Sequence, residues 1–190
     1  STSSSIENSI TNAITSFATN NLKLFNKTFR RSNLLTEIDA LDDAILNSRI
    51  SVRLQQRFTP TLSTTANYTL TFPVALAPVD DVNHIIGSTT LTVGGEIVTI
   101  KNKLNSTTLQ LVTSGGTVVS DNIGSYNPTT GIVSIEGLNP SAFAGTEVKL
   151  FVTPANQSTV RPLLNYVIDV DSTRSTVTTL IDRETTSVVL

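Results

Sequence analysis

Hydrophobic positions near the start of the chain recur every three or four residues, which is the period of an amphipathic helix. The residues of this apolar stripe are Ile6, Ile10, Ala13, Ile14 and Phe17. Ser4 followed by Glu7 fits a capping box, so the helix is expected to begin near Ser5. Asn20 and Asn21 predict its end, because asparagine tolerates the left-handed conformation that commonly closes a helix.

A strand and a second helix are expected next. Leu22, Leu24 and Phe29 lie in a stretch that is too short and interrupted for a helix, and it is interpreted as a strand. The second helix, capped by Ser32 or Asn33, has an apolar face and an acidic face that is expected to face solvent. These two faces are formed by Leu34, Leu35, Ile38, Leu41 and Ile45, and by Glu37, Asp39, Asp42 and Asp43.

Residues 49–58 alternate between apolar and polar, as a half-buried strand does. The apolar side carries Ile50, Val52, Leu54 and Phe58, and the polar side carries Arg49, Ser51, Arg53, Gln55 and Arg57. Gln56 interrupts the apolar side. If this strand and the one before the second helix are parallel neighbours, that helix is a crossover and should be right-handed.

Beyond Phe58 the chain becomes a series of short strands separated by turn residues. Gly94–Gly95 suits a tight hairpin, and Gly115–Gly116 follows another apolar pair. The expected strands contain Tyr68, Leu70 and Phe72, Leu91 and Val93, Val98 and Ile100, Leu109 and Leu111, Val118, Ile135, Val148, Leu150 and Val152, and Val167, Ile168 and Val170. Roughly seven to nine strands predict a β-sandwich or barrel-like region. The expected fold class is α+β, with a small α/β unit over 1–59 and a β-rich domain over 60–190.

Three segments in the first third of the chain resemble a known family. Leu24-Phe25-Asn26-Lys27-Thr28-Phe29, Leu34-Leu35-Thr36-Glu37-Ile38-Asp39 and Ile45-Leu46-Asn47-Ser48-Arg49-Ile50 resemble the C-terminal part of the large J-like baseplate wedge protein of T4-like contractile-tailed phages. The remainder matches loosely, through Tyr126-Asn127, Gly131-Ile132-Val133 and Arg161-Pro162.

The resemblance implies a structural role without active-site residues. It implies a homodimer that also contacts other wedge proteins, in a ring around the tail hub that rearranges when the sheath contracts. The implied location is the baseplate of the virion tail, after assembly in the host cytoplasm. Because the chain lacks methionine and the family's wedge protein is much longer than 190 residues, the sequence is expected to be a fragment whose natural start lies upstream.

Composition agrees with a structural role. A net charge of -2 with 15% charged residues argues against electrostatic capture of nucleic acid or an anionic membrane. The absence of cysteine excludes disulfides and thiolate metal sites. No glycine-rich phosphate loop precedes a helix, and no serine has the surroundings of a nucleophile. No cofactor and no small-molecule substrate are expected.

Two polar clusters have residues that could bind a metal ion. His84 lies near Asp80 and Asp81, and Asp169 and Asp171 share a face of an expected strand, where Asp182 or Glu184 could complete a Ca²⁺ site. Both clusters fit a solvated turn or strand face better, because too few ligands are brought together by spacing. No catalytic, cofactor-binding or metal-ligating residue is predicted.

The polar face of the long strand is the better candidate for a working surface. Arg49, Arg53 and Arg57 recur every four residues, which places neighbours about 13 Å apart on one side of a strand that rises about 3.3 Å per residue. A solvated face that discourages aggregation would explain them. The alternative is a candidate protein interface, in which arginines dock against an acidic neighbour.

Three functions from different classes are compatible with the sequence. A structural subunit of a phage baseplate wedge is favoured, and it predicts self-association. A carbohydrate-binding or adhesin module of a phage tail is the alternative, although such sites stack sugars on exposed aromatic rings and the chain has no tryptophan. A tail-associated hydrolase ranks last, because no spacing identifies a catalytic pair of carboxylates.

Overall fold

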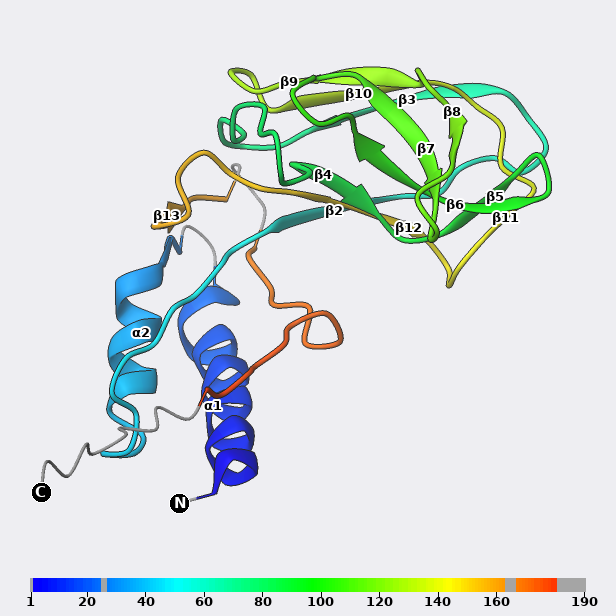
Figure 1. The fold of residues 1–190 in the computed structure, drawn as a ribbon. Coiled ribbons are helices and arrows are strands. Elements are labelled where there is room, and N and C mark those ends of the chain that lie inside the picture. The colour runs from blue at the N-terminus through cyan, green and yellow to red at the C-terminus, as the bar shows by residue number, and fades with distance from the viewer. Residues whose placement is uncertain (1, 25–26, 163–166, 181–190) are drawn as a thin grey trace, which may run out of the picture. The chain divides into compact units, whose positions relative to one another are not determined.

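The computed structural model describes residues 2–24, 27–162 and 167–180 of the chain (Figure 1). The chain divides into two compact units, one formed by Ser1–Ile50 with Arg161–Leu190 and the other by Ser51–Val160. The sequence placed a single division near residue 59. The α+β fold class is confirmed, because two helices near the N-terminus precede a long series of antiparallel strands.

The elements follow one another in the order of their labels in Figure 1. The helical elements are α1 (Ser3–Phe17), the π-helical turn η1 (Ala18–Leu22) and α2 (Arg31–Asp39). The strands are β1 (Phe29–Arg30), β2 (Leu54–Phe58), β3 (Ala66–Thr71), β4 (Ile86–Ser88), β5 (Leu91–Val93), β6 (Glu96–Asn102), β7 (Leu109–Thr113), β8 (Val118–Ser120), β9 (Gly124–Asn127), β10 (Ile132–Leu138), β11 (Ala142–Phe143), β12 (Val148–Val152) and β13 (Thr159–Val160).

The first helix is confirmed, but its predicted start and the strand after it are wrong. Thr2 caps α1 by accepting a hydrogen bond from the Ser5 amide (3.3 Å), so the Ser4–Glu7 capping box does not form. At its other end the helix continues through η1, and Leu22 is buried there. Leu22 therefore belongs to the helix rather than to the expected strand. Of that strand only β1 forms.

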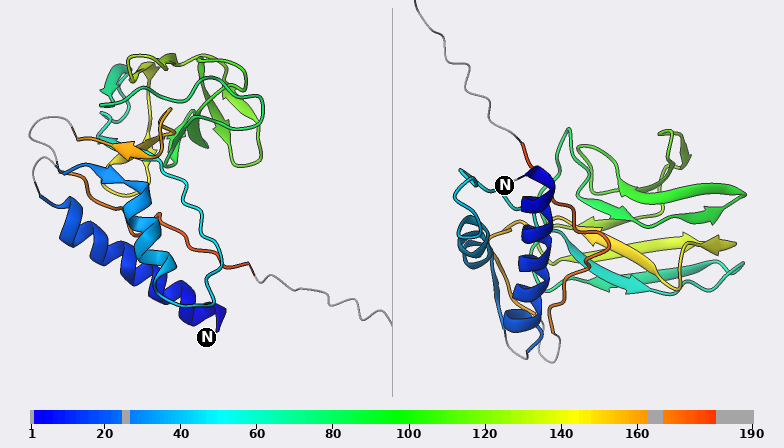
Figure 2. Two further views of the ribbon diagram at one scale, coloured as in Figure 1. Left: turned by 90° about the vertical axis from the view of Figure 1, so that its left-hand side faces the viewer. Right: turned by 90° about the horizontal axis from the view of Figure 1, so that it is seen from below.

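The second helix is confirmed but shorter than predicted. Leu34 and Ile38 are buried, whereas Leu41 lies beyond the end of α2 and is 41% exposed. The helix stops because Asp42 forms a turn instead of a further helical turn: its Oδ1 accepts a hydrogen bond from the Ala44 amide at 2.9 Å. α1 and α2 contact each other, and they lie side by side in both views of Figure 2.

The long strand predicted over 49–58 is reduced to β2. The Val52 amide donates to the side-chain Oε1 of Gln157 (2.8 Å), so this residue is held by a side chain rather than by a strand ladder. β2 pairs antiparallel with β12, in the register Phe58↔Val148, and it shares no sheet with β1. The condition for a right-handed crossover, two parallel neighbouring strands, is therefore not met.

Three sheets of the 51–160 unit enclose one core. Their strand orders are β3-β10-β9, β11-β5-β6-β7-β8 and β2-β12-β4 (Figure 1). All three contribute fully buried side chains, among them Val133 from β10, Ile100 from β6 and Leu150 from β12. Burial of a large aliphatic side chain stabilises a fold by about 1.5–3 kcal/mol, so this shared core is the main stabilising feature of the unit.

The glycine-rich hairpin is confirmed. Gly94 and Gly95 both have positive φ (61° and 86°), and the residues on either side, Val93 and Glu96, face each other in register. Two consecutive left-handed residues define the type I′ turn that matches the twist of a hairpin. The described residues after Thr59 form eleven strands rather than seven to nine, since five are only two or three residues long.

No strand forms within 167–180, so the strand expected at Val167, Ile168 and Val170 is wrong. There Asp171 forms a turn, in which its Oδ1 accepts hydrogen bonds from the Thr173 amide and hydroxyl. Within the described ranges, no helix is long and apolar enough to cross a membrane.

Candidate interaction surface

The three arginines of the predicted interface do not lie on one strand. Arg49 belongs to the unit that contains the helices, while Arg53 and Arg57 belong to the β-rich unit. β2 begins at Leu54, so the alternation of a strand applies to Arg57 and not to the other two. Even strand spacing therefore does not place the three arginines on one face.

Arg53 is tied to the segment that enters β4. Its Nη2 donates to the backbone oxygen of His84 (3.0 Å) and lies 3.5 Å from that of Ile85. These bonds attach the guanidinium to the residues just before β4, and Arg53 remains exposed overall. Part of the donor capacity of Arg53 is therefore used within the chain.

Arg57 lies on β2 at the edge of its sheet and is exposed. Its Nη1 is 3.8 Å from Oε2 of Glu147, and both side chains are about half exposed (52% and 42%). Lys149 faces Arg57 directly in the antiparallel register, so two cations are neighbours here, and Glu147 lies close to Arg57. An exposed ion pair of this kind contributes about 0–1 kcal/mol to stability.

The region around His84 is a loop held by hydrogen bonds. Oδ1 of Asp80 accepts hydrogen bonds from the backbone amides of Asn83 and Val82, both at 2.7 Å. These bonds, that of Asn83 first, lower the pKa of the Asp80 carboxyl. Nδ1 of His84 lies 2.6 Å from the backbone oxygen of Asn102, and carries the proton because that oxygen can only accept. In the part of the chain that the structure describes, no three metal-binding side chains come together.

Asn102 is the important polar residue that the sequence reasoning missed. It is completely buried at the end of β6, where its Oδ1 accepts from the amides of Ile85 (2.7 Å) and Ile86 (2.9 Å). Its Nδ2 donates to the backbone oxygens of Lys103 (2.8 Å) and Ser106 (3.3 Å). The alternation of Val98, Ile100 and Asn102 was the available signal, since it places an amide at a core position.

Asp169 and Asp171, the two residues considered as calcium ligands, each have a partner of another kind in the described structure. Asp169 forms an ion pair with Lys23, at 3.3 Å between Oδ1 and Nζ, and both side chains are exposed. Asp171 is occupied by the turn at Thr173. Asp182 and Glu184 lie outside the described residues.

The comparison with known protein families concerns the N-terminal part of the chain. Residues 1–57 match the family of baseplate structural protein gp6, C-terminal domain III. That range covers α1, η1, β1, α2 and most of β2, and is under a third of the 190 residues. No curated protein matches the chain.

This match supports a structural role in a phage baseplate, and with it a place in the tail of the virion and contact with other baseplate proteins. It suggests a role that is not enzymatic. It covers Arg49, Arg53 and Arg57, but most of the β-rich unit lies outside it.

Proposed function

We propose that this chain is part of a baseplate wedge protein of a contractile phage tail, and that it forms a homodimer and contacts other wedge subunits. The observation that carries the proposal is the match of residues 1–57 to the baseplate domain. We expect the protein to act through interfaces, without a bound cofactor, nucleic acid, membrane or small-molecule substrate, and to assemble in the host cytoplasm. These interfaces would switch from one arrangement to another when the sheath contracts.

The β-rich unit is suited to such a role because some of its strand edges are exposed. β2 borders one sheet, and β11 and β8 border another. The other border strand of the first sheet, β4, packs against β6 instead. Val118 and Val119 on β8 are both partly exposed (45% and 39%), which gives this edge an apolar surface. Arginines near β2 would supply polar contacts, and the β8 edge would supply apolar contacts. Protein interfaces combine both kinds.

The location of the protein can be tested on intact virions. Antibodies raised against the chain, viewed by immunogold electron microscopy, are expected to label the baseplate end of the tail. Label on the capsid, along the sheath or at fibre tips alone would contradict the wedge assignment.

Self-association can be tested on the purified chain. Size-exclusion chromatography with light scattering is expected to show a species of twice the 20.3 kDa chain mass at high micromolar concentration. A chain that stays strictly monomeric there would argue against the homodimer, while leaving the baseplate location to the labelling experiment.

Charge reversal tests the arginines as interface residues. We expect Arg49→Glu combined with Arg57→Glu to weaken the dimer about tenfold or more, because each reversal places a carboxylate where an acidic partner would lie. Arg161→Glu is the matched control, since Arg161 is exposed and lies outside the predicted interface. Equal dissociation constants for the double variant and the control, with unchanged circular dichroism, would remove these arginines from the interface.

A further inference from the structure

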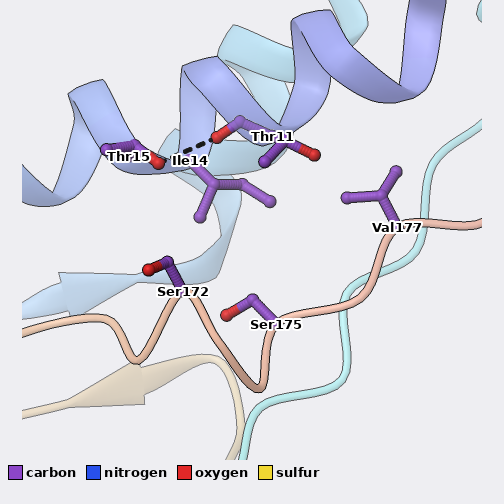
Figure 3. A pocket seen from close by; sticks show the side chains of 6 residues that line it. All are labelled: Thr11, Ile14, Thr15, Ser172, Ser175 and Val177. Atoms are coloured by element: carbon purple, nitrogen blue, oxygen red, sulfur yellow. Dashed lines mark hydrogen bonds between the residues drawn. The ribbon is translucent and has the colours of Figure 1, made fainter. Parts of the chain in front are cut away.

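The segment 167–180 lies along α1, although it comes from the opposite end of the chain. The amide and hydroxyl of Thr179 both donate to Oε1 of Glu7, at 3.0 and 2.8 Å. Ion pairing of Asp169 with Lys23 attaches the other end of the segment. Between these attachments, side chains of both elements line a small pocket (Figure 3): Thr11, Ile14, Thr15, Ser172, Ser175 and Val177.

The attachments show that the segment runs antiparallel to α1. Asp169 contacts a residue just beyond η1, whereas Thr179 contacts the second turn of α1. Sixteen positions separate Glu7 and Lys23, about 24 Å at a helical rise of about 1.5 Å per residue. Ten extended residues would span about 33 Å at about 3.3 Å each, and the turn in which the Arg174 amide donates to the Asp171 oxygen (3.1 Å) takes up the excess.

The contacts that hold this segment are polar and partly exposed. The Lys23 and Asp169 side chains are 48% and 63% exposed, and such a pair contributes little to stability. Ile168, Val170 and Val177 are half-buried, whereas the exposed positions include the serines and threonines Ser172, Thr173, Ser175, Thr176 and Thr178. A segment without its own secondary structure and with little apolar burial is expected to open locally far more often than the unit unfolds.

Glu7 is the strongest attachment point. It is the one charged residue of α1, and its carboxylate receives two donors from a single residue of the segment. The Thr179 amide, and after it the Thr179 hydroxyl, lower the pKa of the Glu7 carboxyl because both bonds favour its charged form. Next to Glu7 lies the apolar stripe of α1, in which Ile6, Ile10 and Ile14 are half-buried.

We propose that residues 167–180 are a detachable strap on α1, latched by Glu7, and that opening of the strap uncovers the apolar stripe of the helix. The strap would control how much apolar surface the helical unit presents. This inference does not depend on the baseplate role, because it rests on contacts within one chain.

Hydrogen exchange measured by mass spectrometry tests the latch. We expect Glu7→Ala to speed exchange of the strap amides about threefold to tenfold, since the acceptor of the Thr179 amide is removed. Amides in the middle of α1, from Ile10 to Phe17, should keep their protection. Glu7→Gln retains an acceptor oxygen and should fall between the wild type and Glu7→Ala.

Glu37→Ala is the matched control, because it removes the same side chain from an exposed position on α2. Binding of the dye ANS gives a second readout and is expected to increase in Glu7→Ala but not in Glu37→Ala. Unchanged strap exchange in Glu7→Ala would overturn the latch. Equal acceleration in the strap and the middle of α1, or no gain in ANS binding, would overturn the idea of a detachable cover.

Discussion

Replacing Asn102 with alanine is expected to cost about 2–5 kcal/mol of unfolding free energy, because the buried amides of Ile85 and Ile86 lose their acceptor together. Each buried donor left without a partner costs about 1–3 kcal/mol. That loss is a large part of the roughly 5–15 kcal/mol that stabilises a typical domain. Urea unfolding of the full chain, followed by far-UV circular dichroism, measures the effect.

Asn67→Ala is the control for this prediction. Oδ1 of Asn67 also accepts from one backbone amide, that of Gly137 (2.8 Å), but in an exposed setting where water can take its place. Its replacement should cost only about 0.5–1 kcal/mol. Equal losses for the two variants would mean that burial of Asn102 contributes nothing to holding β4 beside the end of β6.

Gly131→Ala is expected to destabilise the β-rich unit by about 3–5 kcal/mol, through backbone strain and a steric clash together. Gly131 has a φ of 73°, in the left-handed region that disfavours any residue with a Cβ. An added Cβ would also collide with the backbone oxygens of Val74 and Phe72. Relief would require movement of the turn where the Phe72 amide donates to the Gly131 oxygen (2.9 Å).

Gly137→Ala separates the two causes. Gly137 has a similar φ of 64°, but an added Cβ there would meet nothing within 4 Å. Its replacement should therefore show the strain alone, about 1–2 kcal/mol. If thermal unfolding gave the same loss for both glycines, the close approach of the chain to Gly131 would not be a constraint on the fold.

The apolar patterns that located the helices and strands did not locate where these elements end. Periodicity placed α1, α2 and the Gly94–Gly95 hairpin correctly, because apolar spacing and a left-handed turn are local properties. It misplaced the end of α2, where one side-chain hydrogen bond to Asp42 outweighed a continuing apolar pattern. It also extended β2 back to Arg49, because alternation alone cannot reveal that Gln157 holds the Val52 amide.

The three arginines of the candidate interface show the same limit of sequence patterns. Arg49, Arg53 and Arg57 are evenly spaced in the sequence, yet they fall in two units and have different neighbours. The groups that each arginine contacts are set by residues far away in the sequence, such as His84 and Glu147. The interface therefore stays a prediction to be tested by charge reversal.

By itself, the sequence determined the α+β class, the apolar stripes of both helices, the tight hairpin and the resemblance to a baseplate protein, which the family match over residues 1–57 supports. Only the tertiary structure decided which polar groups are buried and which distant segments meet. Asn102 became a central core residue, and Glu7 became the partner of Thr179 rather than a helix cap. The reason is that local patterns are set by neighbours along the chain, whereas the partner of a hydrogen bond is chosen by packing between segments that are far apart in sequence.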